Sequence, residues 1–333
     1  MGKELSIAIV LGILIGFIVG FGVWRANKLI NIPSSNVSNL QPDIDTSESE
    51  DQPTSDLISL SKPKANQIIS SDGVNVTGIT TPDTYVTLLS LNGGYIKRSN
   101  DKGVFEIPFP LEGGVNKFKL DVLSDGTLKG DTEIQVVLST EFFDKEINSI
   151  LLQDSVNSAS ASESAEEKSA RLEIEILKKN PTSYIGVITQ ITENKLEIEG
   201  TNSEILLANM GTSTKYINSA DKEIKFTDLA IGDHVAALGF KVENKILDTK
   251  RVLLTTPSDF SNRFALAGSV TKIDKKVMTL TSDGKEFSLT FPKSWTGPEI
   301  KEISDGDKVI ALGANDDGKY TIEVIEIVSS TSN

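Results

Sequence analysis

The sequence has no cysteine, a single histidine and fewer basic than acidic residues. Without cysteine, the chain cannot form a disulfide framework, a thiolate nucleophile or a Cys-ligated metal site. Its 33 Lys and Arg residues against 47 Asp and Glu residues give a net charge of −14, which disfavours binding to nucleic-acid phosphates. P-loop, GxSxG and HExxH motifs are also missing. We therefore expect a protein that is not an enzyme, without catalytic, cofactor or metal sites and without a nucleic-acid partner.

The N-terminal part contains one long apolar run, from Leu5 to Trp24, without a charged residue. At about 1.5 Å per residue, a helix of this length reaches roughly 30 Å, the thickness of a bilayer core. We therefore expect a transmembrane anchor in residues 1–30, with residues 5–24 in the lipid bilayer. Two alternatives remain: a signal peptide cleaved near Gly20–Gly22, and a buried helix of a soluble domain.

The charges that flank the apolar run do not fix its orientation, because Lys3 nearly balances Arg25 and Lys28. Only a few residues precede the run, and everything after it resembles exported modular β protein. We therefore expect a single-pass cell-membrane protein with the bulk of the chain extracytoplasmic. Three glycines in the run, spaced four residues apart, lie on one helix face and permit a homodimer through the anchor: Gly12, Gly16 and Gly20. The alternative is that glycine is simply frequent in membrane helices.

Residues 31–56 differ sharply from the apolar run. They contain three prolines, many Ser and Asn residues, and six acidic residues without a Lys or Arg. Such a composition cannot bury enough apolar surface to fold. We expect a disordered acidic linker that holds the later domains away from the membrane, and loose attraction of divalent cations is the alternative role.

Residues 57–140 alternate short apolar runs with turn signals, a spacing typical of an antiparallel β-sandwich. The runs include VNVTGI, YVTLLSL and VFEIPF, separated by segments such as SSDG, NGG, NDKG and SDGTLKG. Several segments resemble the bacterial immunoglobulin-like modules found as the B domain of glucodextranase: Pro63, Val76–Gly78, Asn100–Phe105 and Leu111–Asn116. The resemblance implies an Ig-like accessory module for support, adhesion or ligand presentation.

Residues 141–182 predict a helical connector. Ser164 and Glu167 form a capping box that opens a helix through Lys179, and Asn180-Pro181 ends it. Within this helix, Leu172 and Ile176 are expected to rest on a neighbouring module.

An internal repeat follows the connector. IGVITQITENKLEIE at 185–199 is echoed by AGSVTKIDKKVMTLT at 267–281, and LAIGDHVAALGF at 229–240 is echoed by ISDGDKVIALGA at 303–314. Each copy then ends in a hairpin and a last strand. We expect a tandem duplication of one small domain, in residues 183–256 and 263–330, with the second copy shorter in its middle.

Each copy contains five or six predicted strands, enough for a small OB-like β-barrel. Glycine in the first strand, and again after VAAL or VIAL, is expected where a tight barrel bends. The overall expectation is a mainly β protein: a transmembrane helix, an Ig-like sandwich, a helical connector and two tandem OB-like barrels.

The repeats also resemble a widespread bacterial β-barrel family of unknown function, with LxxGDxV in the middle and a basic residue in the closing strand. Residues 229–235 and Lys250–Val252 match this pattern. The second copy departs from it, because Ser304-Asp305 precedes its Gly-Asp pair and Glu323 and Glu326 replace the basic pair. The resemblance therefore implies a fold and no activity.

The one histidine, His234, follows Asp233 in the first copy, and Lys308 takes its place in the second. Because side chains alternate along a strand, His234 is expected to point away from Val235, towards solvent. A surface histidine is the favoured interpretation, and a ligand or catalytic role limited to the first copy is the alternative. Asp233 is expected to shape the turn through a side-chain to backbone hydrogen bond.

These features discriminate between three functions. The favoured one is a non-enzymatic, membrane-anchored extracytoplasmic scaffold or adhesion protein with an unknown protein or glycan partner. The alternative is an array of carbohydrate-binding or cell-wall-binding modules, with exposed aromatic residues stacking on sugar rings: Trp295, Tyr85, Tyr95 and Phe291. A carboxylate-based hydrolase has no motif to support it. Asn315–Gly318 lacks the later ligands of a calcium loop and predicts a hairpin turn.

Overall fold

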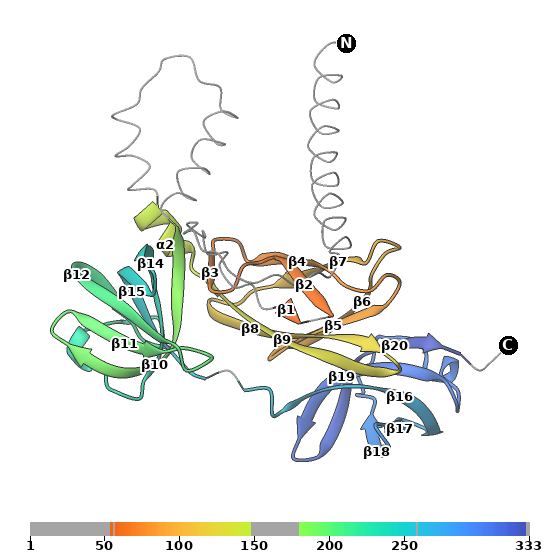
Figure 1. Ribbon diagram of the computed structural model, residues 1–333. Helices are drawn as coiled ribbons and strands as arrows, with labels where there is room; N and C mark the ends of the chain where they lie inside the picture. The colour runs from red at the N-terminus through yellow and green to blue at the C-terminus, as the bar shows by residue number, and fades with distance from the viewer. Residues whose placement is uncertain (1–53, 56, 148–179, 258, 331–333) are drawn as a thin grey trace, which may run out of the picture. The chain divides into compact units, whose positions relative to one another are not determined.

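The computed structural model describes residues 54–55, 57–147, 180–257 and 259–330 (Figure 1). The chain divides into two units, Met1–Ser49 and Glu50–Asn333, and every described residue belongs to the second. Strands make up most of these residues, so the expected mainly β fold is confirmed. Among them, no helix is both long and apolar enough to cross a bilayer. The apolar run at 5–24 with its three glycines, nearly all of the linker, and the helix expected at 164–179 lie outside the described residues.

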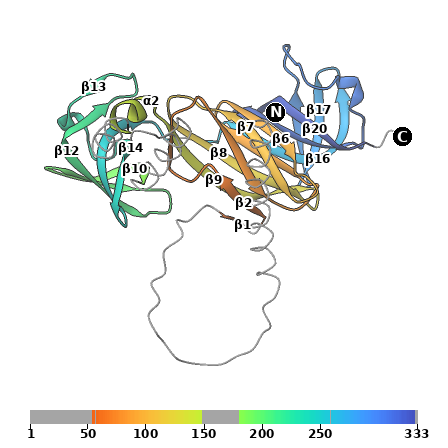
Figure 2. The same cartoon turned by 90° about the horizontal axis from the view of Figure 1, so that it is seen from above.

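The first module is a sandwich of two sheets. One sheet has the strand order β1 (Thr54–Ser55), β2 (Ile58–Lys62), β4 (Gly73–Ile79) and β7 (Val104–Pro110). The other has the order β3 (Gln67–Ile69), β9 (Thr127–Leu138), β8 (Gly114–Ser124), β5 (Tyr85–Ser90) and β6 (Gly93–Arg98). Strands β8 and β9 form its longest hairpin and lie side by side in both views (Figures 1 and 2).

The core of the sandwich follows from strict alternation of apolar residues. In β7, Phe105, Ile107 and Phe109 are buried while the residues between them are exposed. They pack in one cluster with Phe118 and Leu120 of β8. Because side chains in a strand alternate between faces, this period of two places one apolar face of each sheet inside the sandwich.

Two boundaries of the sandwich differ from the sequence-based prediction. Thr54 and Ser55, assigned to the linker, pair with β2 as a two-residue strand. Residues 127–130, assigned to a turn, belong to β9, because the turn needs only Asp125 and Gly126, which both have positive φ. Two such residues close a tight hairpin without the longer loop that the sequence suggested.

A single helical turn follows β9. The helix α2 (Thr140–Phe142) begins after Ser139, whose side chain accepts a hydrogen bond from the backbone N–H of Phe142. It continues as a π-helical turn, η1 (Phe143–Ile147). The next strand, β10, begins at Pro181, inside the range predicted for the connector.

Two barrels form the rest of the described chain. The first contains β10 (Pro181–Thr192), β11 (Lys195–Glu199), β12 (Ile205–Ile217), β13 (Glu223–Ile224), β14 (His234–Glu243) and β15 (Ile246–Thr255). Its neighbours run β11-β10-β14-β15-β12, and β11 also pairs with β12, which closes the ring. The second is a closed barrel in the order β16-β17-β18-β20-β19. Its strands are β16 (Arg263–Asp274), β17 (Val277–Ser282), β18 (Lys285–Thr290), β19 (Lys308–Asp316) and β20 (Lys319–Ser329).

The two barrels share strand order and direction, so the expected tandem barrel domain is confirmed. In the first barrel β12 and β15 are parallel, in the second β18 and β20 are parallel, and the other neighbours are antiparallel. The short 3₁₀ turns η2 (Phe226–Asp228) and η3 (Ile300–Glu302) precede β14 and β19. A common topology in two stretches of similar sequence is what a duplication predicts.

Glycine occupies the points where the barrel strands approach most closely. A Cβ on Gly186 would lie 2.0 Å from the carbonyl oxygen of Glu199, and one on Gly268 would lie 2.1 Å from that of Thr281. The closing hairpins repeat this close approach, since a Cβ on Gly239 would lie 2.1 Å from the carbonyl oxygen of Asp248 and one on Gly313 would lie 2.0 Å from that of Thr321. A register shift directly precedes each of these two glycines. Glycine therefore stands where the backbones of neighbouring strands approach most closely, at the positions where bends are expected.

The Gly-Asp turn is built in the same way in both copies. Asp233 accepts a hydrogen bond from the backbone N–H of Ala230 at 2.8 Å, and Asp307 accepts one from Ser304 at 2.8 Å. The predicted turn-shaping role of Asp233 is therefore confirmed.

Each barrel also contacts the sandwich through the outer face of two strands, β10 and β14 in the first barrel and β16 and β19 in the second. Ile185 of β10 and Phe240 of β14 join a cluster with Phe142 of α2, the helical turn that follows the sandwich. In the second barrel, Ala267 of β16 and Leu312 of β19 join a cluster with a residue of β5. The described modules therefore share hydrophobic clusters.

Candidate functional site

The predicted sugar-stacking aromatics do not form one site. Trp295 is half-buried in the second barrel, where it packs edge-on against the buried Phe291 and donates to the carbonyl of Pro298 at 2.8 Å. Tyr95 packs in the sandwich core, whereas Tyr85 packs against the opposite face of the same sheet. Tyr85, Tyr95 and Trp295 are partly buried against hydrophobic clusters, whereas Phe291 is fully buried. Sugar contact by the first three stays a prediction.

His234 is half-buried and not directed simply towards solvent. Its Nδ1 shares a hydrogen bond of 2.7 Å with the hydroxyl of Thr255 on the neighbouring strand. Burial lowers the pKa of His234, and the positive charge of Lys117 lowers that pKa further. The alternation rule placed the side chain on the correct outer face of the barrel, but it contained no information about the sandwich residues that lie near this face.

Asn315–Gly318 forms a turn, as predicted. Asp317 and Gly318 both have positive φ, and the Asn315 side chain accepts a hydrogen bond from the backbone N–H of Gly318. Among the described ranges, no group of three or more His, Cys, Asp or Glu side chains is arranged to hold a metal ion.

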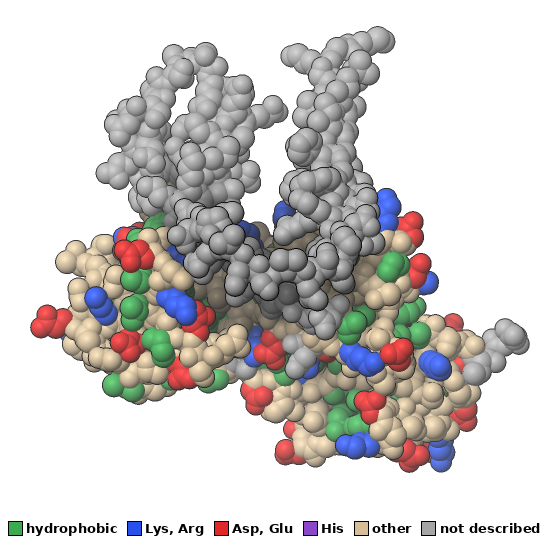
Figure 3. All heavy atoms as spheres, in the orientation of Figure 1, with side chains coloured by type: hydrophobic (Ala, Val, Ile, Leu, Met, Phe, Trp, Pro, Cys, Tyr) green, Lys and Arg blue, Asp and Glu red, His purple; other side chains and the backbone are tan. Residues whose placement is uncertain are grey.

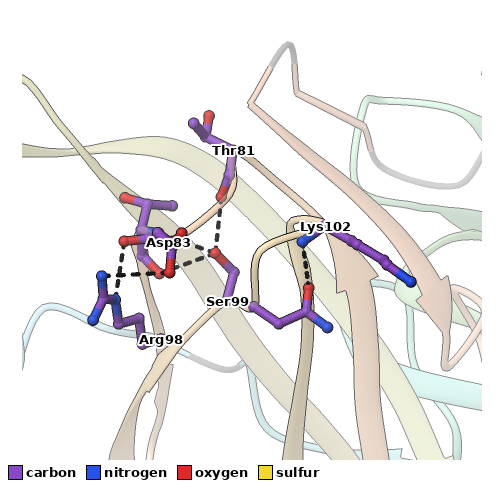
Figure 4. A network of polar contacts seen from close by, with 7 residues as sticks. Thr81, Asp83, Arg98, Ser99 and Lys102 are labelled. Carbon is purple, nitrogen blue, oxygen red and sulfur yellow. Dashed lines mark hydrogen bonds and ion pairs between the residues drawn. The ribbon is translucent and has the colours of Figure 1, made fainter.

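A polar network lies at one end of the sandwich (Figure 4). The buried Ser99 donates to the carbonyl of Thr81 at 2.8 Å and accepts from the backbone N–H of Thr84. Nearby, the Nε of Arg98 donates to the carbonyl of Asp83 at 3.1 Å. These bonds satisfy the backbone of the loop before β5. In the loop before β7, the side chain of Asn100 accepts bonds from the backbone N–H groups of Lys102 and Val104. The network therefore explains the NDKG segment as loop structure.

Charged side chains of both signs are interspersed on the face in Figure 3, so this view favours no strongly charged surface. A different feature is a cleft of about 550 Å³. It is lined from the first barrel by Ile217, Asn218, Ser219, Asp221, Arg251, Leu253, Leu254, Thr255 and Thr256. From the sandwich and the α2 turn, it is lined by Leu91, Gly113, Gly114, Val115, Leu138, Ser139, Thr140 and Glu141.

The main charged group of the cleft is Arg251 on β15. Only 5% of its side chain is exposed, and its Nη2 donates to the carboxylate of Glu141. Its Nε has no hydrogen-bond partner among the described residues. The Glu141 side chain is 57% exposed and also pairs with Lys145 at 3.6 Å. The cleft thus holds a buried guanidinium with one accessible partner.

Cations lower the pKa values of two carboxyl groups in and near the cleft. Hydrogen bonding and charge from Arg251 lower the pKa of Glu141, with a smaller contribution from Lys145. The pKa of Glu223 is lowered mainly by Lys215 and, at longer range, by Lys145 and Arg251. Neighbouring cations therefore stabilise the ionised form of both carboxyl groups.

The first barrel differs from the second in the features that form this cleft. Arg251 pairs with Leu238 in the barrel register, and Val324 takes the matching place opposite Leu312. Strand β12 has 13 residues and β18 has 6. The additional part of β12 pairs with β13 and leads into the lining residues after Ile217.

The sequence-based prediction missed this site. It placed Arg251 only in a family pattern and noted the longer middle of the first copy without a role. The comparison of the two copies set Glu323 and Glu326 against the basic pair, whereas the strand register places Val324 at the position of Arg251. Nothing in the sequence linked that cation to Glu141, which lies 110 residues earlier.

No family model matches the sequence, and no curated protein does. Among solved structures, the chain is similar to "drosophila Unr CSD456", with a TM-score of 0.16 and 15% sequence identity. The similarity covers 74% of this chain and 97% of that chain. At this TM-score the similarity carries no inference about function.

Proposed function

We propose that the protein is a non-catalytic binding protein of the cell surface, held at the membrane by residues 5–24 and acting in adhesion or interaction. The apolar run, the acidic linker and the resemblance of the β modules to exported modular proteins support this proposal. As part of it, we assign the sandwich to the Ig-like class. The cleft around Arg251 is the proposed contact site for the partner.

The observation that carries this proposal is the presence of Arg251 where the duplicate barrel has Val324. Burying a guanidinium requires removing it from water, and hydrophobic replacement of buried ion pairs is often neutral or stabilising. The second barrel forms the same ring with valine, so an arginine is not required by the topology. A costly residue that the fold does not need is expected to serve binding.

The test uses full-length protein crosslinked in native membranes. Arg251→Val introduces the residue of the second copy, and we expect it to abolish capture of the partner while leaving the fold intact. The matched control is Lys285→Val, which removes an exposed cation from β18 of the second barrel. Equal capture by Arg251→Val and the unmodified protein would contradict a role for the cleft.

The proposed location has its own test. Proteases added to intact cells are expected to cut within residues 57–330, because we place these residues outside the membrane. Protection of this region in intact cells, together with cleavage after the cells are opened, would reverse the proposed orientation.

Binding to glycans or to the cell wall remains the second candidate. Its support is the hydroxyl-rich lining of the cleft, since the aromatic residues first considered for this role are separated. If Trp295→Ala lost glycan binding and Arg251→Val retained it, the glycan site would lie at Trp295 in the second barrel and not in the cleft.

A further inference from the structure

The cleft has the size and lining of a site for a small polar ligand. Its volume of about 550 Å³ lies within the range of small-molecule sites. Its lining includes six side chains with a hydroxyl or amide group: Ser139, Thr140, Asn218, Ser219, Thr255 and Thr256. Three of them already bond within the chain: Ser139 accepts from Phe142, Asn218 accepts from Ala220 and Lys222, and Thr255 bonds to His234. Hydroxyl and amide groups both donate and accept hydrogen bonds, as sugar hydroxyls do, so each retains further bonding capacity. This inference rests on the proposed function and names a ligand for the same site.

Arg251 adds an anion-binding group to this lining. A guanidinium binds a carboxylate most strongly when two N–H donors are used, and the Nε of Arg251 has no described partner. Its present partner, Glu141, is more than half exposed and lies on a helix of three residues. Displacing Glu141 therefore returns an already accessible carboxylate to water, while Arg251 stays buried.

We propose that the cleft binds a sugar acid, whose carboxylate displaces Glu141 from Arg251 while its hydroxyl groups bond to the hydroxyl and amide side chains. Glu141 is then a built-in competitor that occupies the guanidinium in the free protein. The apolar residue Leu253, on the outer face of β15, supplies surface for the carbon face of the ring.

An acidic peptide also offers carboxylates, but the cleft fits it less well. Peptides are commonly recognised by strand addition at a sheet edge or in an apolar groove. Strand β15 pairs with β14 on one side and with β12 on the other, so it has no free edge. Hydroxyl and amide groups also make up a large share of the lining, which suits a polyol better than apolar side chains.

The binding test uses calorimetric titration of the full-length protein in detergent micelles with D-glucuronate. D-glucose lacks the carboxylate, glutarate lacks the ring hydroxyls, and tetraglutamate represents an acidic peptide. We expect glucuronate to bind with a Kd of roughly 1 mM, as is reasonable for one small ring. We expect the other three probes to bind at least about tenfold more weakly, because each leaves polar groups of the site unpaired.

Two variants of the ion pair separate this proposal from a purely structural role. Glu141→Gln removes the competing charge and should tighten glucuronate binding about fivefold or more, whereas Arg251→Met should weaken it at least tenfold. The matched controls change the ion pair of the second barrel, where Arg263 holds Glu323 through bonds of 2.7 and 2.5 Å. Glu323→Gln and Arg263→Met should leave the Kd within about twofold.

An unfolded protein cannot bind glucuronate more tightly, so a gain of affinity in Glu141→Gln is informative. This result decides the test even if Arg251→Met does not fold. Equal binding of glucuronate and glucose, or weaker binding by Glu141→Gln, would overturn the proposal. Tighter binding of tetraglutamate would assign the site to acidic peptides instead. If glucuronate does not bind while Arg251→Val still abolishes partner capture, the ligand class is wrong and the proposed function stands.

Discussion

Replacing Gly268 by alanine tests the idea that close strand approach closes the barrels. The new Cβ would lie 2.1 Å from the carbonyl oxygen of Thr281 and 2.8 Å from its carbonyl carbon. Both atoms belong to the backbone of β17, so a side-chain rotation cannot relieve the contact, and β16 must move away from β17. We expect two neighbouring ladder hydrogen bonds to weaken at about 1 kcal/mol each, with about 1 kcal/mol of added strain.

The expected loss is therefore about 3 kcal/mol, and the second barrel contains a natural probe for it. Trp295 packs in its core cluster, and in a Trp24→Phe background it is the only tryptophan. Urea unfolding of the full-length chain, followed by Trp295 fluorescence, should show the midpoint fall by about 2–3 M for a slope near 1 kcal/mol/M.

A graded control distinguishes close approach from backbone strain. Gly318 has a φ of +86°, but a Cβ added there would meet nothing within 4 Å. Alanine there should cost only about 1 kcal/mol, from the left-handed backbone alone. If Gly268→Ala costs no more than Gly318→Ala, the close approach does not control closure of the barrel.

Three further outcomes are expected from single sites. The pKa of His234 in the folded protein is lowered from its usual 6.5, so below pH 6.5 the unfolded chain binds more protons than the folded one. The contribution of His234 to stability is therefore complete above pH 6.5 and falls as the pH drops towards the lowered pKa. His234→Gln should flatten this pH dependence of the unfolding free energy, measured from about pH 7.5 to 5.5. Asp307 is fully buried and bonds to both Ser304 and Ser330, so Asp307→Ala should cost about 2–3 kcal/mol against about 1 for Asp233→Ala; equal losses by calorimetry would contradict this. Phe142 is fully buried between the sandwich and the first barrel, and Phe142→Ala should cost about 3–5 kcal/mol in thermal unfolding, whereas a loss under about 1 kcal/mol would show that the cluster contributes little.

Much of the fold was predictable because its signals are local. The alternation in residues 104–110 and 114–124 identifies strands with one buried face, and glycine and aspartate mark the turns between them. The repeat predicted two barrels of one topology, and the role of Asp233 followed from turn chemistry. The errors lie where a local signal was weak, at the two residues of β1 and at the tight turn before β9.

The candidate site was not predictable by the same means. Arg251, Glu141 and the lining residues after Ile217 come from three separate segments, and each has an ordinary local role as a strand, helix or loop residue. The packing of the aromatic side chains was not predictable for a related reason, because composition indicates that Tyr95 and Trp295 are able to bind sugars but not whether a core also uses them.

The sequence by itself determined the strands, the turns, the duplication and the lack of thiol chemistry, because these depend on residue type and on spacing along the chain. Only the tertiary structure decided that Arg251 is buried against Glu141 beside a hydroxyl-lined cleft. Burial and pairing depend on which segments meet in space, and the pairing of residues 110 positions apart has no signature in either segment alone.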